Sequence, residues 1–162
     1  MQVPNNSGMK EKIEKQKING KVYVWKYLEN SRNYPGWNFT VDKIGSGSLL
    51  ELLDLMKRCE WSSRKEIQIS NPKENQLKVP NNQNGSAKWK TVSKLILSSK
   101  RNAEKELWKV IVKETEIEIE FGENKLIEFE KAISGIPKGI GDFAISSDSE
   151  EDILYLWWNV ES

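Results

Sequence analysis

The sequence predicts a single α+β domain built on a largely antiparallel mixed sheet with two helices. The length of 162 residues lies in the common range for one domain, and no disulfide or metal is needed to staple a core of that size. Several segments alternate apolar and polar residues with the period of a strand, whereas two segments have the apolar spacing of a helix. Turn-forming residues separate these segments, so strands and helices are expected to mix within one domain.

The first predicted strand follows a polar leader. Residues 1–20 are rich in Asn, Ser, Lys, Glu and Gln and lack an apolar block, which predicts a flexible leader with a short helical stretch from Lys10 to Lys17. The folded domain is then expected to span residues 21–162. Its first strand is predicted at Lys21 to Leu28, where three aromatic residues share one face: Tyr23, Trp25 and Tyr27.

A turn-rich stretch from Glu29 to Gly47 follows this strand. We predict a long surface loop there, because Pro35-Gly36 and Gly45-Ser46-Gly47 favour turns. Loop aromatics beside Pro and Gly lose little entropy on binding, so Tyr34 and Trp37 are candidate contacts to a protein partner. The competing interpretation is that these two side chains plug the core from the loop. Both interpretations stay open on the sequence alone.

The remaining elements follow from periodicity and turn residues. Ser48 and Glu51 have the spacing of a capping box, which predicts a helix that begins at Ser48 and ends near Cys59. The apolar parity shifts between Leu107 and Phe121, which predicts a hairpin that turns at Lys113-Glu114. A second helix is predicted from Leu126 to Gly135. Further strands are expected over 66–70, 77–80, 89–97 and 153–160.

The absence of histidine argues against most enzyme classes. Histidine is the usual proton carrier near neutral pH and the commonest metal ligand, so the ordinary triads, dyads and zinc sites are excluded. The seven tryptophans favour packing and recognition instead. The single cysteine, Cys59, cannot form an internal disulfide, which indicates a reduced thiol and a cytoplasmic location. We therefore predict no catalytic residue, no cofactor and no membrane insertion.

The charge distribution is segmented although the formal net charge is only +1. The segment from Lys57 to Lys109 carries a surplus of basic residues together with three tryptophans, which is typical of single-stranded nucleic-acid binding. The alternative function is therefore nucleic-acid binding through Lys88, Trp89, Lys90, Lys94 and Arg101. The simpler interpretation is that these lysines alternate with core residues along ordinary strands, since no RNA- or DNA-binding motif accompanies them.

A row of acidic residues lies in the second half of the predicted hairpin. Glu114, Glu116, Glu118 and Glu120 are spaced to share one face of a strand. One interpretation is that lysines of a neighbouring strand, such as Lys90 and Lys94, pair across this face. The other is that the face meets a basic protein partner, which makes these four glutamates candidate partner-binding residues.

Other carboxylates allow a weaker enzymatic hypothesis. Two carboxylates in a suitable environment suffice for glycoside cleavage, so Asp42, Asp54 and Asp142 define a carboxylate-dependent hydrolase as a further alternative. The acidic residues from Asp148 to Asp152 do not have the spacing of an EF-hand calcium loop. We interpret them as an acidic hairpin turn.

The C-terminal part carries a resemblance. Lys138-Gly139-Ile140-Gly141-Asp142-Phe143-Ala144-Ile145, followed by Leu154-Tyr155-Leu156-Trp157-Trp158, resembles the C-terminal ends of small bacterial cytoplasmic proteins. In general profile the chain is similar to the immunity proteins of bacterial polymorphic toxin systems. That resemblance implies a small single-domain α+β protein that blocks a cognate toxin by direct binding, and it assigns no contact residue. We assign four aromatic residues to the core: Trp25, Trp108, Phe143 and Trp157.

Overall fold

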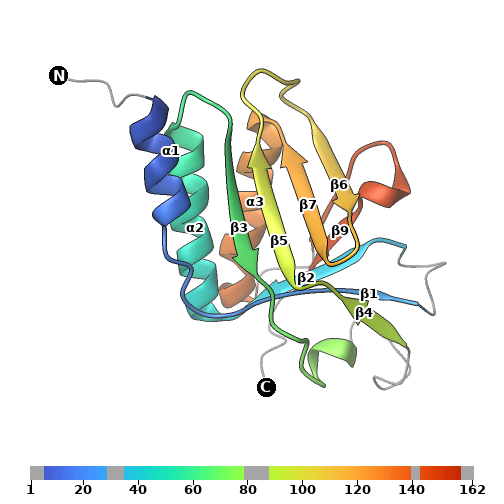
Figure 1. The fold of residues 1–162 in the computed structure, drawn as a ribbon. Helices are drawn as coiled ribbons and strands as arrows, with labels where there is room; N and C mark the ends of the chain where they lie inside the picture. Colours follow the sequence, from blue (N-terminus) through green and yellow to red (C-terminus); the bar gives the residue numbers. More distant parts are fainter. Residues whose placement is uncertain (1–5, 29–34, 79–87, 140–142, 158–162) are drawn as a thin grey trace.

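The computed structural model describes residues 6–28, 35–78, 88–139 and 143–157 (Figure 1). These residues form three α-helices, α1 (Asn6–Lys15), α2 (Lys43–Arg58) and α3 (Glu123–Gly135). The strands are β1 (Val22–Tyr27), β2 (Trp37–Val41), β3 (Ser63–Gln68), β4 (Trp89–Thr91), β5 (Lys94–Ser99), β6 (Trp108–Val112), β7 (Glu116–Phe121), β8 (Phe143–Ile145) and β9 (Leu154–Leu156). Short 3-10 turns are η1 (Gln76–Lys78), η3 (Ile136–Lys138) and η4 (Glu150–Asp152).

The strands form two sheets rather than the one predicted. A five-stranded sheet has the order β4-β1-β2-β9-β8, and a four-stranded sheet has the order β3-β5-β7-β6. Within each sheet one neighbouring pair is parallel, β2 with β9 and β5 with β7, and the other pairs are antiparallel. The α+β class and the largely antiparallel pairing are confirmed, whereas the described helices number three and not two.

Helix α1 belongs to the folded domain. Its residue Ile13 is completely buried in the main core, and Met9 and Ile18 pack against that core. Lys65 of β3 donates a hydrogen bond from Nζ to the Glu14 carbonyl at 2.6 Å. The buried isoleucine and this contact hold α1 against the rest of the described chain, and the short helix expected from Lys10 to Lys17 overlaps α1.

The predicted long loop before α2 contains a strand and the start of the helix. Strand β2 is buried at every position, and α2 begins at Lys43, five residues before the predicted start. Asp42 is the N-cap and accepts a hydrogen bond from the Gly45 N–H at 2.7 Å. A Cβ on Gly45 would lie 2.8 Å from the Lys21 carbonyl, so glycine allows the chain to pass close to the helix. The end of the helix at Arg58, capped by Cys59, agrees with the prediction.

One predicted strand is divided between the two sheets. Residues 89–91 form β4 in the five-stranded sheet, and the chain crosses through Val92 and Ser93 into β5 of the four-stranded sheet. The predicted hairpin is confirmed, since β6 and β7 pair antiparallel across residues 113–115. The predicted strand at 77–80 is wrong for its described residues, because Gln76–Lys78 form a 3-10 turn.

Helix α3 lies behind the four-stranded sheet and α2 lies beside β3 next to α1, as Figure 1 shows, and buried residues of both helices belong to the main core. Phe129 of α3 lies among Phe39, Trp108 and Phe121, with ring centroids 5.7 to 6.3 Å apart. These edge contacts join elements of both sheets to one helix. Burial confirms the core assignment of Trp108, whereas Phe143 is only partly buried at the margin of this core.

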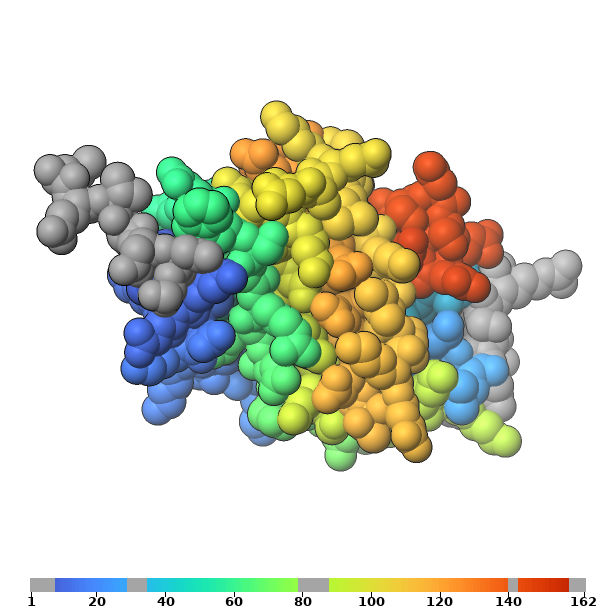
Figure 2. Space-filling model, turned by 45° about the horizontal axis from the view of Figure 1, so that its top comes forward, coloured from blue at the N-terminus to red at the C-terminus, as the bar shows by residue number. Residues whose placement is uncertain are grey.

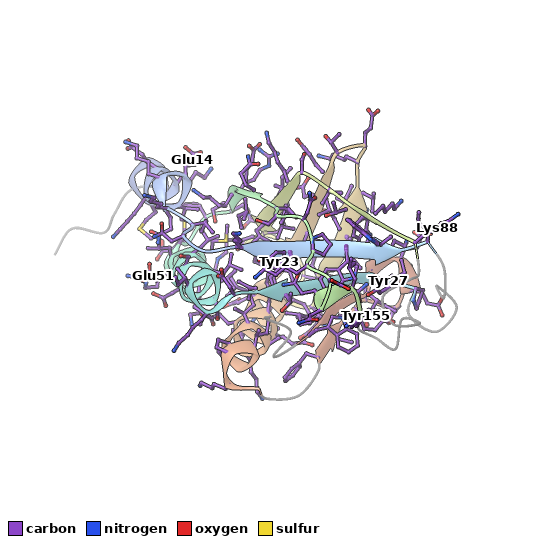
Figure 3. All side chains as sticks on the ribbon, turned by 90° about the horizontal axis from the view of Figure 1, so that it is seen from below. Glu14, Tyr23, Tyr27, Glu51, Lys88 and Tyr155 are labelled. Atoms are coloured by element: carbon purple, nitrogen blue, oxygen red, sulfur yellow. The ribbon has the colours of Figure 1, made fainter. Side chains whose placement is uncertain are left out.

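A second apolar cluster covers the opposite face of the five-stranded sheet. Tyr23, Trp25 and Tyr27 of β1 point to this side, and Figure 3 shows Tyr23, Tyr27 and Tyr155 on the face that it views. Trp25 and Trp157 are buried here, as assigned. The Trp157 indole donates a hydrogen bond to Asn38 Oδ1 at 2.8 Å, which satisfies two buried polar groups at once.

Candidate protein-binding face

The outer face of the four-stranded sheet is not covered by any helix of the described chain. Figure 2 shows this face, which extends from α1 beside β3, across β5 and β7, to β6 and the η4 turn. Side chains alternate along each strand, so the residues between the buried Ile117, Ile119 and Phe121 point outward. We call the following residues the charged face: Arg64, Glu66, Lys94, Lys100, Lys109, Lys113, Glu116, Glu118 and Glu120.

Glu118 lies at the centre of the charged face. Its Oε2 accepts a hydrogen bond from the Ser98 hydroxyl at 2.6 Å, and its Oε1 accepts one from Lys113 Nζ at 3.2 Å. Burial works to raise the pKa of Glu118, but the two hydrogen bonds and the charges of Lys113 and Arg64 outweigh it and lower the pKa. The two hydrogen bonds therefore favour the ionised form of Glu118 and fix the orientation of its carboxylate.

Two other acidic residues of this face, Glu120 and Glu66, also have cationic neighbours. Lys100 Nζ lies 3.3 Å from Glu120 Oε2. On β3, Glu66 lies 3.8 Å from both Arg64 and Lys94. The interpretation of cross-strand pairing is thus confirmed for Glu118 and Glu120, but through Lys113 and Lys100.

The lysines named from the sequence are placed differently. Lys94 lies opposite Glu116 in the parallel register but pairs with Glu66. Lys90 belongs to β4 of the five-stranded sheet, away from the acidic row. Glu114 is exposed in the turn between β6 and β7, so the row on the strand has three glutamates and not four. The predicted hairpin turn at Lys113-Glu114 already places Lys113 near the acidic row. Lys100 could not be placed near that row without knowing that β5 pairs in parallel with β7.

The structure does not place Trp37 on an exposed loop. Trp37 begins β2 and is only 2% exposed, and Lys26 and Lys90 lie over its ring with Nζ 6.0 and 5.8 Å from the centroid. The expectation of an exposed contact is therefore wrong for Trp37, and the alternative of a core position is correct. Tyr34 lies outside the described residues.

The five residues of the nucleic-acid hypothesis are not brought together. Lys88, Trp89 and Lys90 lie at the β4 edge of the five-stranded sheet. Lys94 begins β5 and Arg101 follows its end, so β5 separates them by roughly 20 Å at about 3.3 Å per residue. The basic segment is thus distributed over two sheets, with Glu116, Glu118 and Glu120 between its strands.

The carboxylates of the hydrolase hypothesis are also separated. Asp42 caps α2 and accepts a hydrogen bond from the Lys21 N–H at 3.0 Å. Asp54 lies three turns later on the same helix, about 18 Å away at 1.5 Å per residue, and pairs with Arg58 at 3.0 Å. Asp142 lies outside the described residues. No group of three His, Cys, Asp or Glu residues in the described chain could hold a metal ion.

The acidic residues before β9 form the predicted hairpin turn, because β8 and β9 pair antiparallel around η4. Asp152 fixes this turn to β6. Its Oδ1 accepts a hydrogen bond from the Val110 N–H at 2.9 Å, and its carbonyl accepts one from the Trp108 indole at 2.7 Å. Its Oδ2 accepts the Ser147 hydroxyl. The function of Asp152 in the structure is to join the two sheets.

Comparison of the chain with protein-family models, with curated proteins and with solved structures found no match. The described helices include none that combines the length and the apolar character required to cross a bilayer. The assignment of a function to the charged face therefore depends on its geometry alone.

Proposed function

We propose that the protein is a non-catalytic cytoplasmic protein that binds a protein partner through the charged face, as an immunity-type inhibitor binds a toxin. The observation that carries the proposal is the ordered set of charges on an uncovered sheet face. Hydrogen bonds and ion pairs already hold Glu118 and Glu120 in place, so little side-chain entropy remains to be lost on binding. Preorganised charges of both signs select a partner with the complementary pattern and steer its approach.

The proposed partner is a protein with a basic row that meets Glu116, Glu118 and Glu120. Rows of lysine flank this acidic row on both sides, with Lys94 and Lys100 along β5 and with Lys109 and Lys113 along β6. A partner that is uniformly basic would therefore be repelled at the flanks, whereas one with acidic residues beside its basic row would fit. This pattern favours one specific protein over a polyanion.

Charge reversal on the face tests the proposal. Glu116, which is half-buried and has no hydrogen bond to a described side chain, can be changed without breaking one. We expect Glu116→Lys to weaken binding of a captured partner by about tenfold or more, because it places like charges in contact across the interface. Glu74→Lys is the matched control, since Glu74 is exposed in the segment between β3 and η1. The measurement is the dissociation constant of wild type and both variants at two salt concentrations.

Co-expression tests the inhibitory part of the proposal. The products of neighbouring reading frames are expressed with the wild-type protein or with Glu116→Lys, and cell growth is followed. We expect wild type and Glu74→Lys to protect against one such product, and Glu116→Lys to fail. Equal protection by all three variants, or substrate turnover by the purified protein, would contradict the proposal.

The alternatives from the sequence receive less support from the geometry. Single-stranded nucleic-acid binding requires a continuous track of cations and stacking faces, but Lys90 belongs to one sheet and Arg101 follows a strand of the other. A carboxylate-dependent hydrolase requires two neighbouring carboxylates, but Asp42 and Asp54 are three helical turns apart. A gel-shift assay at low salt and a turnover assay distinguish these alternatives from protein binding.

A further inference from the structure

A groove lies beside the charged face, where α1 meets the beginning of β3 and the end of β5. It has a volume of about 200 Å³, and its lining includes Lys10, Glu14, Ser63, Arg64, Ser99 and Lys100. Figure 2 shows α1 directly beside β3 at this side of the molecule, and Figure 3 shows Glu14 on α1. The groove is smaller than the ~300–1,000 Å³ typical of sites for drug-sized ligands. It is therefore suited to a small group.

Cations predominate in the groove. Lys10, Arg64 and Lys100 contribute three positive charges against the one negative charge of Glu14. Lys10 has no ion pair with any residue of the described chain, and Arg64 has only a long contact of 3.8 Å to Glu66. Lys100 is the one cation with a closer partner, Glu120 at 3.3 Å. An anion in the groove would meet at least one cation that is not already paired.

One hydroxyl group of the lining residues is closed off from the groove. Ser63 is 7% exposed, and its Oγ is buried without a hydrogen-bond partner. The neighbouring hydroxyls are already engaged, since Ser62 Oγ accepts the Arg101 N–H at 3.0 Å and Ser98 donates to Glu118. Ser63 shares its side of β3 with the buried Ile67 and not with Arg64, and its Oγ is closed off from solvent, so this hydroxyl is not available to a ligand in the groove.

We propose that this groove binds the oxyanion of a phosphoryl group. Arg64 can donate two parallel hydrogen bonds to phosphate oxygens, and Lys10 supplies a point charge beside it. Glu14 repels the anion and limits its affinity. The shared chemistry is a phosphomonoester or phosphate dianion, which reaches the groove either as free phosphate or as the phosphate of a nucleotide.

An NMR titration with small ligands tests phosphate binding separately from the proposed protein binding. Backbone amide NMR signals of residues 62–64 and 99–101 are followed while sodium phosphate, adenosine 5′-monophosphate or adenosine is added at constant ionic strength. We expect saturable shifts with phosphate and with the nucleotide but not with adenosine. Equal affinities indicate free phosphate as the ligand, and much tighter nucleotide binding indicates a nucleotide.

Variants of Lys10 and Glu14, which lie outside the charged face, are expected to change the affinity for phosphate in opposite directions. Lys10→Gln should weaken phosphate binding by about two- to fivefold, as expected for an exposed charge, whereas the control Lys12→Gln on the same helix should not. Ser63→Ala should leave it unchanged, because the Ser63 hydroxyl is closed off from solvent. Glu14→Gln should strengthen it, with Glu11→Gln as its control. Absence of saturable shifts, or equal responses of Lys10→Gln and Lys12→Gln, would overturn the proposal and leave the protein-binding proposal intact.

Discussion

At the scale of single residues, Glu118 combines partial burial with full hydrogen bonding. A carboxylate in this position would gain a proton easily if burial acted alone. The Ser98 hydroxyl at 2.6 Å and Lys113 Nζ at 3.2 Å reverse that tendency, and the pKa of Glu118 is lowered from its ordinary value of 4.5. Ionised Glu118 therefore stabilises the fold as well as setting the pattern of the charged face.

This balance predicts how stability depends on pH. Because the folded pKa of Glu118 lies below 4.5, the unfolded chain binds the proton more tightly, and the stabilisation is present above pH 4.5. It is lost as the pH falls through the folded pKa. We expect Glu118→Gln to lower the free energy of unfolding at pH 7 by about 1 kcal/mol through loss of the charge-assisted hydrogen bonds.

Urea denaturation of wild type and Glu118→Gln between pH 7 and pH 3 measures this effect. The difference in unfolding free energy between the two proteins should shrink below pH 4.5. Glu74→Gln reports the effect of removing an exposed carboxylate. A difference that is constant with pH, or that grows in acid, would show that Glu118 is not stabilised in its ionised form.

At the scale of elements, α1 shows what composition alone does not reveal. The helix is mostly polar, and only Met9 and Ile13 provide an apolar side. Such a short helix has little stability by itself, so its formation depends on contacts with β3 and α2 that the sequence does not display. The start of α2 was missed for a related reason, because Gly45-Ser46-Gly47 favours a turn unless Gly20 and Lys21 pack against it.

Truncation of the buried α1 side chain tests whether the helix belongs to the domain. Ile13 is fully buried, so Ile13→Ala should lower the free energy of unfolding by about 2–4 kcal/mol through lost burial and a residual cavity. Lys12→Ala, one residue earlier and exposed, should change it by less than about 0.5 kcal/mol. Chemical denaturation measures both values. Equal and small effects would mean that α1 is not docked in solution.

The hairpin of β6 and β7 was predicted correctly because its signal is local. The apolar parity changes between Val112 and Ile117, and a short polar turn separates them. The charged face was only partly predictable, since Glu116 to Glu120 could be assigned to one side of a strand whereas their cationic neighbours come from other strands. Trp37 was assigned to a loop because Pro35-Gly36, directly before it, favours a turn. The strand that follows is buried at every position, so it lacks the alternation of apolar and polar residues that would reveal it.

At the scale of the whole molecule, the two sheets are joined at several places in the described chain, including a bridge between Tyr23 and Ser70. The chain passes from β4 to β5 through Val92 and Ser93, and the η4 turn of the β8–β9 hairpin is hydrogen-bonded to β6 through Asp152. The division into two sheets could not be predicted, because strand order depends on pairings between segments far apart in the sequence. These joints imply that the sheets unfold together.

Substitution of Asp152 tests the joint at the η4 turn. Asp152→Ala leaves the Val110 N–H and the Ser147 hydroxyl without their acceptor, so we expect a loss of about 1–3 kcal/mol in the free energy of unfolding. Glu151→Ala is the control, since Glu151 is exposed in the same turn. Hydrogen exchange of the β6 amides should accelerate in Asp152→Ala alone. If β6 exchanges at the wild-type rate, the turn does not secure the two sheets to each other.

The position of β9 between β2 and β8 has a consequence for biosynthesis. Thr40 of β2 and Trp157 after β9 are hydrogen-bonded although they lie 117 positions apart in the sequence. During translation, the backbone groups of Trp37 to Phe39 that later bond to β9 must wait until residues 154–156 leave the ribosome. The nascent polypeptide therefore exposes an unprotected strand edge on β2 until these residues emerge, and that edge is open to pairing with other chains in the meantime.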